Sequence, residues 1–309
     1  MKLYNFNGYE QNFKTYGGTA GVKIGITIKG VDYMLKYPGK LKDAHMKNVE
    51  ISYSNSPVCE HLGCEIFKSI GIDTQKTYLG VRNDKIVVAC RDFLKPGEIF
   101  VPFKDIKATF EPAFTDPQGD ITNGTGTNLD EIIRTMNEHP LLRQFPDIKK
   151  RFWDMFIVDS LIGNPDRNNE NWGLIRSTEN SFRIAPVFDC GNCFNGKLSE
   201  RQMREFLSGN MQEISLMRPC IYERAPGKRI NAHQYISSHI NKDCDKAVNR
   251  IVPRIDLNEI SGIINDTPGI GDVEKEFYER LIQIRYEENL FPALQYLQKR
   301  ELEFDMEER

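Results

Sequence analysis

The first ninety residues show hydrophobic patterns typical of a small sheet interrupted by one helix. Apolar and polar residues alternate in four short segments, and apolar residues recur at helical spacing between the second and the third of them. Glycines and an Asn-Asp pair stand where the chain must turn. The pattern predicts a hairpin over 18–38 with its turn near Lys29-Gly30 and its second strand over 31–37, a helix over 55–71, and strands near 76–82 and 85–91.

The rest of the chain shows mainly helical patterns. Residues 95–128 are rich in proline and glycine, which predicts an irregular connection with a mobile surface loop over 116–127. A polar turn between two short apolar runs predicts one further hairpin, with strands over 172–176 and 182–188. Apolar residues at helical spacing predict helices from Asn128 or Asp130 to about 145, over 147–162, and near 199–209, 231–252, 256–265 and 271–303, the last kinked or divided by Pro292.

Two acidic residues and an asparagine stand around the second hairpin in positions that suit phosphoryl transfer. Asp166 follows a predicted helix, Asn171 stands five positions later, and Asp189 ends the second strand, before Cys190 and Gly191. Phosphoryl transfer needs one carboxylate to orient the attacking hydroxyl, and an amide oxygen with a second carboxylate to hold Mg²⁺ against the nucleotide phosphates. We expect the hairpin to bring Asp189 beside Asn171. The spacing D-x-x-x-x-N, hairpin, D-x-G is that of the catalytic and metal-binding loops of protein kinases.

The N-terminal half supplies further parts of a kinase site. Lys36 stands in a predicted strand directly after a glycine-bearing hairpin, where a kinase lysine reaches the nucleotide phosphates. Glu60, near the start of the predicted helix, is the expected ion-pair partner of Lys36, and Glu65 is the alternative. The glycines over 17–21 let backbone amides approach a phosphate, although hairpin turns use glycine for the same positive φ.

Each of these features also has a purely structural interpretation. Asn-Pro-Asp and Asp-Arg-Asn-Asn are common in turns, carboxylates often end strands, and a lysine such as Lys36 can keep an edge strand soluble. The occurrence of all of them together, in the order that a kinase requires, favours the catalytic interpretation.

Four segments carry a resemblance to a known family. They are GNPDRNNEN at 163–171, RIAPVFD at 183–189, YMLKYP at 33–38 and CEHLGCEIFKSIGI at 59–72. With them the chain resembles the HipA-like kinases, bacterial relatives of eukaryotic protein kinases and phosphoinositide kinases. That family has a G-N-x-D-R-H-x-x-N catalytic loop, then L-A-P-x-[YF]-D, preceded by a W-I-x-K strand and a helix opened by N-E. Within the family, the resemblance is closest to a small pro-inflammatory, cell-translocating Ser/Thr kinase.

The resemblance implies a role for each matching position. Asp166 is implied to be the catalytic aspartate. Asn171 and Asp189 are implied to be the Mg²⁺ ligands. Lys36 is implied to bind phosphate, with Glu60 as its ion-pair partner and with both counted as catalytic residues.

The resemblance also implies where ATP lies. The loop over 17–22 is implied to cover the phosphates, and the hinge backbone near 89–93 is implied to contact adenine. The implied nucleotide-binding residues are Gly18, Thr19, Ala20, Gly21, Val22, Lys36, Cys90, Asp92, Asn171 and Asp189.

Three departures from the family pattern limit what carries over. Asn168 replaces the family histidine, so we expect no role for that ring. The hinge reads ACRDF where many members have E-R-F-D, which leaves the adenine contacts open by a residue or two. The family's extra N-terminal subdomain helps many members sit in antitoxin complexes. We expect it to be missing here, because the implied phosphate loop begins before residue 25, and an antitoxin partner is therefore doubtful.

Composition narrows the remaining function classes. The chain has 309 residues, 39% of them apolar, enough for about two units of ordinary domain size with a buried core. A net charge of -3 gives no electrostatic case for a nucleic acid as the main partner. No apolar run reaches the roughly 18 residues of a membrane-spanning helix, and the N-terminus lacks the apolar run of a secretory signal. We therefore expect neither a membrane span nor a Sec-type signal.

The seven cysteines point to a reducing compartment such as the cytoplasm, because an odd number in a chain of this length does not suggest disulfide staples. Cys190 and Cys193 have the spacing of a redox pair, and Cys59, His61 and Cys64 form a local group of metal-ligand types. Buried free thiols are the favoured interpretation of most of the seven. The resemblance, by contrast, implies a protein that leaves the bacterium and acts in host cells.

The sequence thus predicts an α+β, two-lobed protein-kinase-like fold similar to the C-terminal part of HipA. Its small β-rich N-lobe is predicted over 1–93, and its larger, mainly helical C-lobe over 94–309. The predicted activity is ATP- and Mg²⁺-dependent transfer of the γ-phosphoryl group to Ser/Thr hydroxyls of an unidentified protein, with autophosphorylation and a role as a secreted pro-inflammatory effector. Two alternatives stay open: a nucleotide-binding interaction module without turnover, and a lipid or small-molecule kinase of the same fold.

Overall fold

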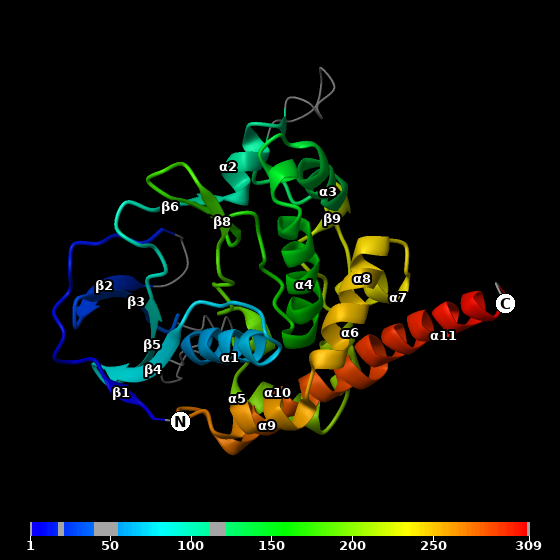
Figure 1. The fold of residues 1–309 in the computed structure, drawn as a ribbon. Helices are drawn as coiled ribbons and strands as arrows, with labels where there is room; N and C mark the ends of the chain where they lie inside the picture. The colour runs from blue at the N-terminus through cyan, green and yellow to red at the C-terminus, as the bar shows by residue number, and fades with distance from the viewer. Residues whose placement is uncertain (1, 18–21, 40–54, 112–121, 308–309) are drawn as a thin grey trace. The chain divides into compact units, whose positions relative to one another are not determined.

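The computed structural model describes residues 2–17, 22–39, 55–111 and 122–307 (Figure 1). The chain forms two units, and each unit is made of three segments that are separated in sequence. Unit 1 comprises Met1–Phe93, Pro186–Met211 and Asp256–Leu281. Unit 2 comprises Leu94–Ala185, Gln212–Ile255 and Ile282–Arg309. The predicted division into lobes at residue 93 stays a prediction.

Unit 1 contains a five-stranded sheet in the order β1-β4-β5-β3-β2. All neighbouring strands are antiparallel except β1 and β4, which are parallel. Some cross-strand pairs join β-branched or aromatic residues, which suit a pleated surface, as in Ile26 with Tyr33, Ile28 with Val31 and Val81 with Ile86. The strand bounds are β1 (Tyr4–Asn5), β2 (Lys23–Ile28), β3 (Val31–Lys36), β4 (Thr77–Arg82) and β5 (Lys85–Arg91).

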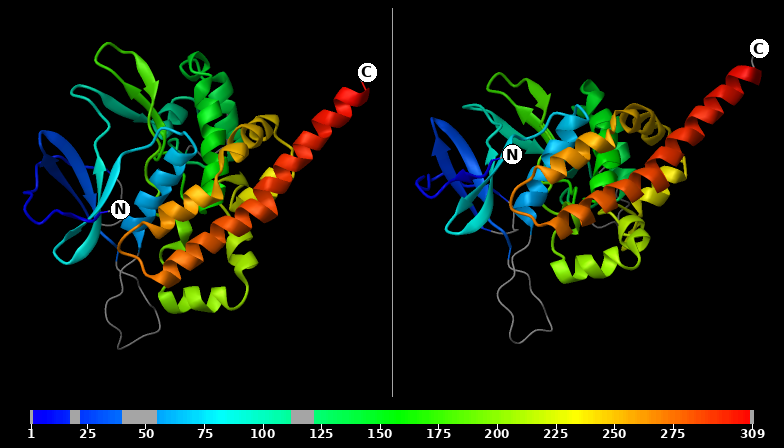
Figure 2. Two further views of the ribbon diagram at one scale, coloured as in Figure 1. Left: turned by 60° about the horizontal axis from the view of Figure 1, so that its bottom comes forward. Right: turned by 90° about the horizontal axis from the view of Figure 1, so that it is seen from below.

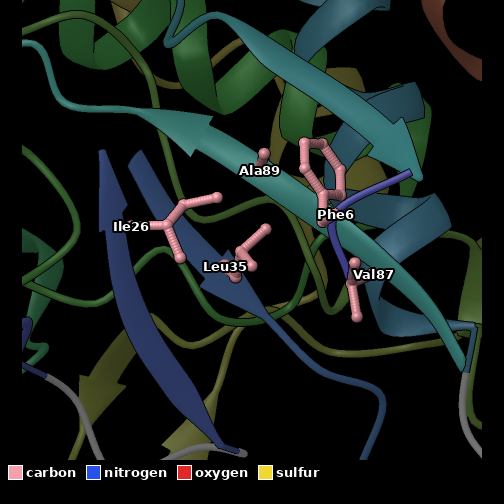
Figure 3. Close-up of a cluster of buried hydrophobic side chains, with 5 residues drawn as sticks. All are labelled: Phe6, Ile26, Leu35, Val87 and Ala89. Atoms are coloured by element: carbon pink, nitrogen blue, oxygen red, sulfur yellow. The ribbon is translucent and has the colours of Figure 1, made fainter. Parts of the chain in front are cut away.

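The two faces of this sheet have different neighbours. Five side chains gather on one face, those of Phe6, Ile26, Leu35, Val87 and Ala89 (Figure 3). Side chains alternate between faces along a strand, so the next residue along β3 and its cross-strand partner on β5 point to the opposite face. Helix α1 (Ser56–Ser69) packs against β4 and β5, and ten of its fourteen residues are buried.

The remaining helices of unit 1 come from later parts of the chain. Helix α9 (Leu257–Asn265) packs against α1. Unit 1 also holds the short 3-10 helix η3 (Cys193–Asn195), α5 (Glu200–Leu207) and the first part of α10 (Asp272–Arg285).

Unit 2 is mainly helical and is organised around α4 (Asp147–Ile162), which has twelve buried residues. Helix α8 packs along α4, and Trp153 of α4 stacks on Tyr235 of α7 with ring centroids 5.9 Å apart. The unit also contains a three-stranded sheet in the order β6-β7-β8 and a separate small hairpin, β9-β10. The bounds are β6 (Ile99–Pro102), α2 (Phe103–Ala108), α3 (Leu129–Glu138), η2 (Leu142–Gln144), β7 (Gly173–Arg176), β8 (Phe182–Ile184), α6 (Met211–Leu216), β9 (Glu223–Ala225), β10 (Lys228–Arg229), α7 (Ala232–Ser237), α8 (Lys242–Ile251), η4 (Val252–Arg254) and α11 (Phe291–Glu307).

The C-terminal helical run has the division predicted near Pro292. A π-helical segment at Tyr286–Leu290 separates α10 from α11. Pro292, the second residue of α11, has no N–H to donate to that preceding turn. The start of α11 packs on α7 and α8, and its last turns extend past them (Figure 2). Leu302 and Phe304 are accordingly exposed.

Several sequence-based expectations for unit 2 were wrong in detail. The helix predicted over 231–252 is two helices, α7 and α8, because Asn241 caps a new helix by accepting from the N–H groups of Asp243 and Cys244. The helix predicted to end near 145 ends at Glu138, just before the His139-Pro140 bond.

Two segments held more regular structure than their composition indicated. The connection predicted to be irregular contains β6 and α2, and the segment between two predicted helices contains α6 and β9-β10. The predicted loop over 116–127 lies outside the described residues up to 121. In the described part of the chain, no helix has both the length and the apolar character needed to cross a membrane.

Candidate active site

Lys36 lies between two carboxylates in unit 1. Its Nζ is 2.8 Å from Oε2 of Glu60 and 2.7 Å from Oδ1 of Asp189. Lys36 is the cross-strand partner of Val88, so it points to the sheet face that α1 covers, and Glu60 meets it from α1. The expected Lys36–Glu60 ion pair is therefore present, whereas Glu65 pairs with Lys68 at 2.9 Å.

Glu60 holds Asp189 as well as Lys36. Its second oxygen, Oε1, accepts a hydrogen bond from the backbone N–H of Asp189 at 3.0 Å. Asp189 has a φ of 59°, a left-handed conformation that aspartate tolerates better than most residues. This conformation lets the N–H of Asp189 reach Glu60 while its carboxylate reaches Lys36, so three residues from distant parts of the sequence form one network.

The charges around Lys36 determine its protonation. Burial alone would lower the pKa of Lys36, but the negative charges of Glu60 and Asp189 outweigh it and raise that pKa well above its ordinary value. Glu60 is fully buried, and such a carboxylate is tolerated only when it is paired. Lys36 is therefore a fixed cation whose ammonium group is held at a defined place by two anions.

Close packing of α1 against the segment after Asp189 supports this network. A Cβ on Gly63 would lie 2.5 Å from the Cβ of Cys190, so only glycine permits this approach. Cys193 Sγ donates to the backbone oxygen of Cys59 at 3.1 Å. The C-x-x-C pair thus packs under α1. All seven cysteines lie in the described part of the chain, and all are buried and outside any disulfide. His61 Nδ1 bonds Thr77 Oγ1 at 2.8 Å, and among the described residues no three His, Cys, Asp or Glu side chains gather into a metal site.

The catalytic-loop candidates lie in unit 2, directly after α4. Gly163, with a φ of 66°, ends the helix and starts the loop. Asn164 Oδ1 accepts from the backbone N–H of Asp166 at 3.2 Å, and Asn171 Nδ2 donates to the backbone oxygen of Asp166 at 2.9 Å. The loop therefore fixes Asp166 from both sides, and it places Asn171 close to Asp166 although five positions separate them.

A buried ion pair that the sequence analysis missed holds this loop. Arg167 donates to both oxygens of Asp159 on α4, at 2.8 Å from Nε and 3.0 Å from Nη2. Tyr222 donates its hydroxyl to the backbone oxygen of Arg167 at 3.0 Å. An aspartate eight positions before Arg167, inside a strongly apolar helix, was the available signal.

Asn168 takes a local role of its own at the position of the family histidine. Its Nδ2 donates to Oδ1 of Asp166 at 3.2 Å, and its Oδ1 accepts from the backbone N–H of Glu170 at 2.9 Å. The Asn168 amide therefore orients the Asp166 carboxylate. The family motif alone did not predict this role for Asn168.

The two residues implied to hold Mg²⁺ have the chemistry that this ion prefers. Mg²⁺ binds carboxylate and amide oxygens. Nδ2 of Asn171 donates to the backbone oxygen of Asp166. The amide oxygen of Asn171 can therefore serve as a ligand for a cation. Asp189, in the other unit, carries a carboxylate whose side chain is 36% exposed. Each residue by itself therefore fits a ligand of Mg²⁺.

The remaining nucleotide-site candidates divide into two groups. Gly18, Thr19, Ala20 and Gly21 lie outside the described residues, and Val22, which follows them, is exposed.

The hinge candidates are Cys90 and Asp92. Cys90 is buried in β5 between its partners Met34 and Thr77. The backbone N–H of Asp92 donates to Asp32, and its carboxylate lies 2.6 Å from Lys14 Nζ. Contact of adenine with these two residues stays a prediction.

Comparison with known proteins gives a consistent assignment. The serine/threonine-protein kinase CtkA of Helicobacter pylori (strain J99) is 35% identical over 278 residues, which cover 88% of this chain and 81% of CtkA. The crystal structure of the H. pylori proinflammatory kinase CtkA superposes with a TM-score of 0.85 at 31% identity, covering 95% of this chain and 98% of CtkA. No protein-family model matches the chain.

A second solved structure shows the fold alone. HipA of Shewanella oneidensis MR-1, in its complex with HipB and operator DNA, superposes with a TM-score of 0.53 at 12% identity, covering 92% of this chain and 68% of HipA. The expected fold class, a β-rich N-terminal region followed by a mainly helical region, is thereby confirmed. The chain belongs to the family of the serine/threonine-protein kinase CtkA and has the protein-kinase-like fold that CtkA shares with HipA.

Proposed function

We propose that the protein transfers the γ-phosphoryl group of ATP to serine or threonine hydroxyls of a protein substrate. The observation that carries this proposal is the network in which Lys36 Nζ lies within 2.8 Å of both Glu60 and Asp189. A lysine fixed by a helix carboxylate beside an aspartate that follows a β-hairpin is the arrangement by which protein kinases bind nucleotide phosphates. Homology to CtkA supports the choice of serine and threonine as acceptors.

In this proposal each side chain has one task. Lys36 binds the phosphates of ATP, and Glu60 keeps its ammonium group in place. Asp166 accepts the proton of the substrate hydroxyl and orients the oxygen for in-line attack. Asn171 and Asp189 would hold Mg²⁺, which supplies positive charge to the phosphates when it is bound. The protein contributes mainly positioning and charge stabilisation.

The test is phosphoryl transfer from radiolabelled ATP by the full chain, with casein as a protein acceptor, phosphatidylinositol vesicles as a lipid acceptor and kanamycin as a small-molecule acceptor. We expect label in casein or in the protein itself, on phosphoserine or phosphothreonine. We expect D166N and D189N each to lower the rate by about 100-fold or more, because each removes a charge needed in the transition state.

A matched control separates chemistry from folding. Asp84 stands in the β4-β5 turn with a φ of 59°, a conformation that asparagine adopts well, so D84N should keep the full rate. Full activity in D166N would overturn the assignment of Asp166. Label only in the lipid or in kanamycin would move the protein to the small-molecule kinases, and nucleotide binding without any transfer would make it a non-catalytic module.

We further propose that the protein shares the pro-inflammatory role named for CtkA. Purified protein added to cultured macrophages should then raise cytokine secretion, and D166N should fail to do so at equal uptake. Equal secretion with both proteins would show that any response does not depend on phosphoryl transfer.

A further inference from the structure

Unit 2 contains a pocket beside the start of the catalytic loop. Its wall includes the end of α4, the loop residues Gly163 to Arg167 except for Asp166, the chain from Arg218 to Tyr222, and the buried side chains of His233 and Arg285. The cavity measures about 30 Å³ on a scale on which one water needs roughly 10–15 Å³. It has room for a small group and not for a nucleotide.

The charge of this pocket is positive. Among the described residues that line it, Asp159 is the only acidic one, and Arg167 engages both of its oxygens. Arg218 and Arg285 add two further guanidinium groups, one exposed at the rim and one buried. Because the single carboxylate is already paired with Arg167, the field inside the pocket favours an anion.

A buried hydroxyl in the lining also indicates a ligand site. Ser215 is 1% exposed, and its Oγ makes no hydrogen bond within the described part of the chain. Its backbone oxygen accepts from Nε of Arg285 at 3.0 Å, which places the hydroxyl-bearing residue next to that guanidinium group. Native proteins rarely leave a buried hydroxyl without a partner, so an oxygen-bearing ligand at this place explains it.

The histidine in the wall does not change the sign of the charge. Burial, together with the nearby Arg285 charge, lowers the pKa of His233 to about 4. His233 Nδ1 is bonded to Asn289 Oδ1 at 3.0 Å. The ring is therefore neutral near pH 7, and the arginines and Ser215 supply the groups that recognise an anion.

Apolar side chains form much of the rest of the wall, among them Phe156, Pro219, Ile221 and Tyr222. A pocket with apolar walls and a few convergent polar groups is typical of sites for small organic molecules. The hydroxyl of Tyr222 also bonds the backbone oxygen of Arg167, so the pocket wall is part of the support of the catalytic loop.

We propose that this pocket binds a small organic anion, with its carboxylate or phosphate group against Arg218, Arg285 and the Ser215 hydroxyl, and its apolar part against Ile221 and Tyr222. The bound anion stabilises the catalytic loop, because Gly163, Pro165 and Arg167 belong both to the pocket and to the loop. This proposal does not depend on phosphoryl transfer.

The experiment measures binding to the full chain by calorimetry, with methyl phosphate, acetate and inorganic phosphate as separate probes, each small enough for a cavity of about 30 Å³. We expect methyl phosphate or acetate to bind about three- to four-fold more tightly than inorganic phosphate, because the buried methyl group adds apolar contact with the wall. The tighter of the two organic probes identifies the class of anion. We expect S215A and R218Q each to weaken binding by about ten-fold, as the loss of one charge-assisted or buried hydrogen bond implies.

Two controls keep the result decisive. Arg254 is exposed on η4 in the same unit and is not part of the lining, so R254Q makes the same change of charge and should bind like the wild type. Hydrogen exchange of the backbone amides over 163–171 should slow when the organic anion is added and should not change in the S215A/R218Q double variant. No binding up to millimolar concentrations, equal weakening in R254Q, or tightest binding of inorganic phosphate would each overturn the proposal.

Discussion

The guanidinium group of Arg285 lies directly against the Cα of Gly163. A Cβ at residue 163 would be 2.5 Å from Nη2 and 2.7 Å from Cζ of Arg285. Arg285 is almost fully buried and donates to the backbone oxygens of Leu161 and Ser215. The residue that ends α4 and begins the catalytic loop must therefore be glycine for two reasons, its left-handed φ and this contact.

We expect G163A to be strongly destabilising. The left-handed conformation alone costs an alanine about 1–2 kcal/mol. The added methyl group also displaces the Arg285 guanidinium from its hydrogen bonds, and we expect this to add roughly 2 kcal/mol. Urea unfolding of the full chain measures the sum.

The control for this prediction is Gly227, in the same unit. It has a φ of 72°, and nothing lies within 4 Å of the place where its Cβ would be. G227A should lose only the conformational part. If both variants lost the same stability, the contact with Arg285 would carry no energetic weight.

Variants of the Lys36–Glu60 pair should separate stability from activity. K36M leaves the fully buried Glu60 carboxylate without its main counter-charge, and we expect a loss of about 3–5 kcal/mol in the free energy of unfolding. The double variant K36M/E60Q removes both charges and should regain much of that stability. Phosphoryl transfer should be lost in both, because neither retains the cation that binds the phosphates.

Thermal unfolding and the ATP assay, run on the same preparations, check this prediction. E60Q alone should keep part of its stability, since an amide oxygen can still accept from the Asp189 N–H. A double variant as unstable as K36M would mean that the charge of Glu60 is not the source of the loss.

How much of the site can be predicted from the sequence depends on how far apart the interacting residues stand along the chain. Lys36 and Glu60 were identifiable because they stand in a strand and in the helix that follows it, two neighbouring elements that the local hydrophobic pattern predicts. The contact between Gly163 and Arg285 joins segments more than a hundred residues apart, and no local pattern announces it. Asn241 is a recognisable N-cap residue in the sequence. The hydrophobic pattern continues on both sides of it, and for that reason a single helix was predicted there.

Buried His233 makes stability depend on acid pH. Burial, aided by Arg285, lowers its pKa to about 4 in the folded protein, against an ordinary value of 6.5. The unfolded chain therefore binds a proton that the folded protein does not, so the stability that this residue contributes is present above pH 6.5 and is lost as the pH falls to about 4. Two and a half units correspond to about 3 kcal/mol.

Replacing the histidine removes this slope. In H233Q, the free energy of unfolding should fall less steeply between pH 6.5 and 4 than in the wild type, even if it starts lower at pH 7. Urea titrations at half-unit steps of pH measure both curves. Parallel curves would show that His233 is already protonated in the folded protein or exposed to water.

Burial of the cysteines predicts that the thiols are chemically inert in the native protein. Cys220, 9% exposed, is the most accessible, and burial raises its pKa to about 12, so little thiolate is present near pH 8. We expect a thiol-specific disulfide reagent to label the native protein about 100-fold more slowly than the protein unfolded in guanidinium, which should expose seven reactive thiols. S208C, which places a cysteine on an exposed turn after α5, should add one rapidly reacting thiol and serves as the control. Rapid labelling of any native thiol in the wild type would show that the packing around that thiol opens easily, and mass spectrometry of the labelled peptide would identify the cysteine.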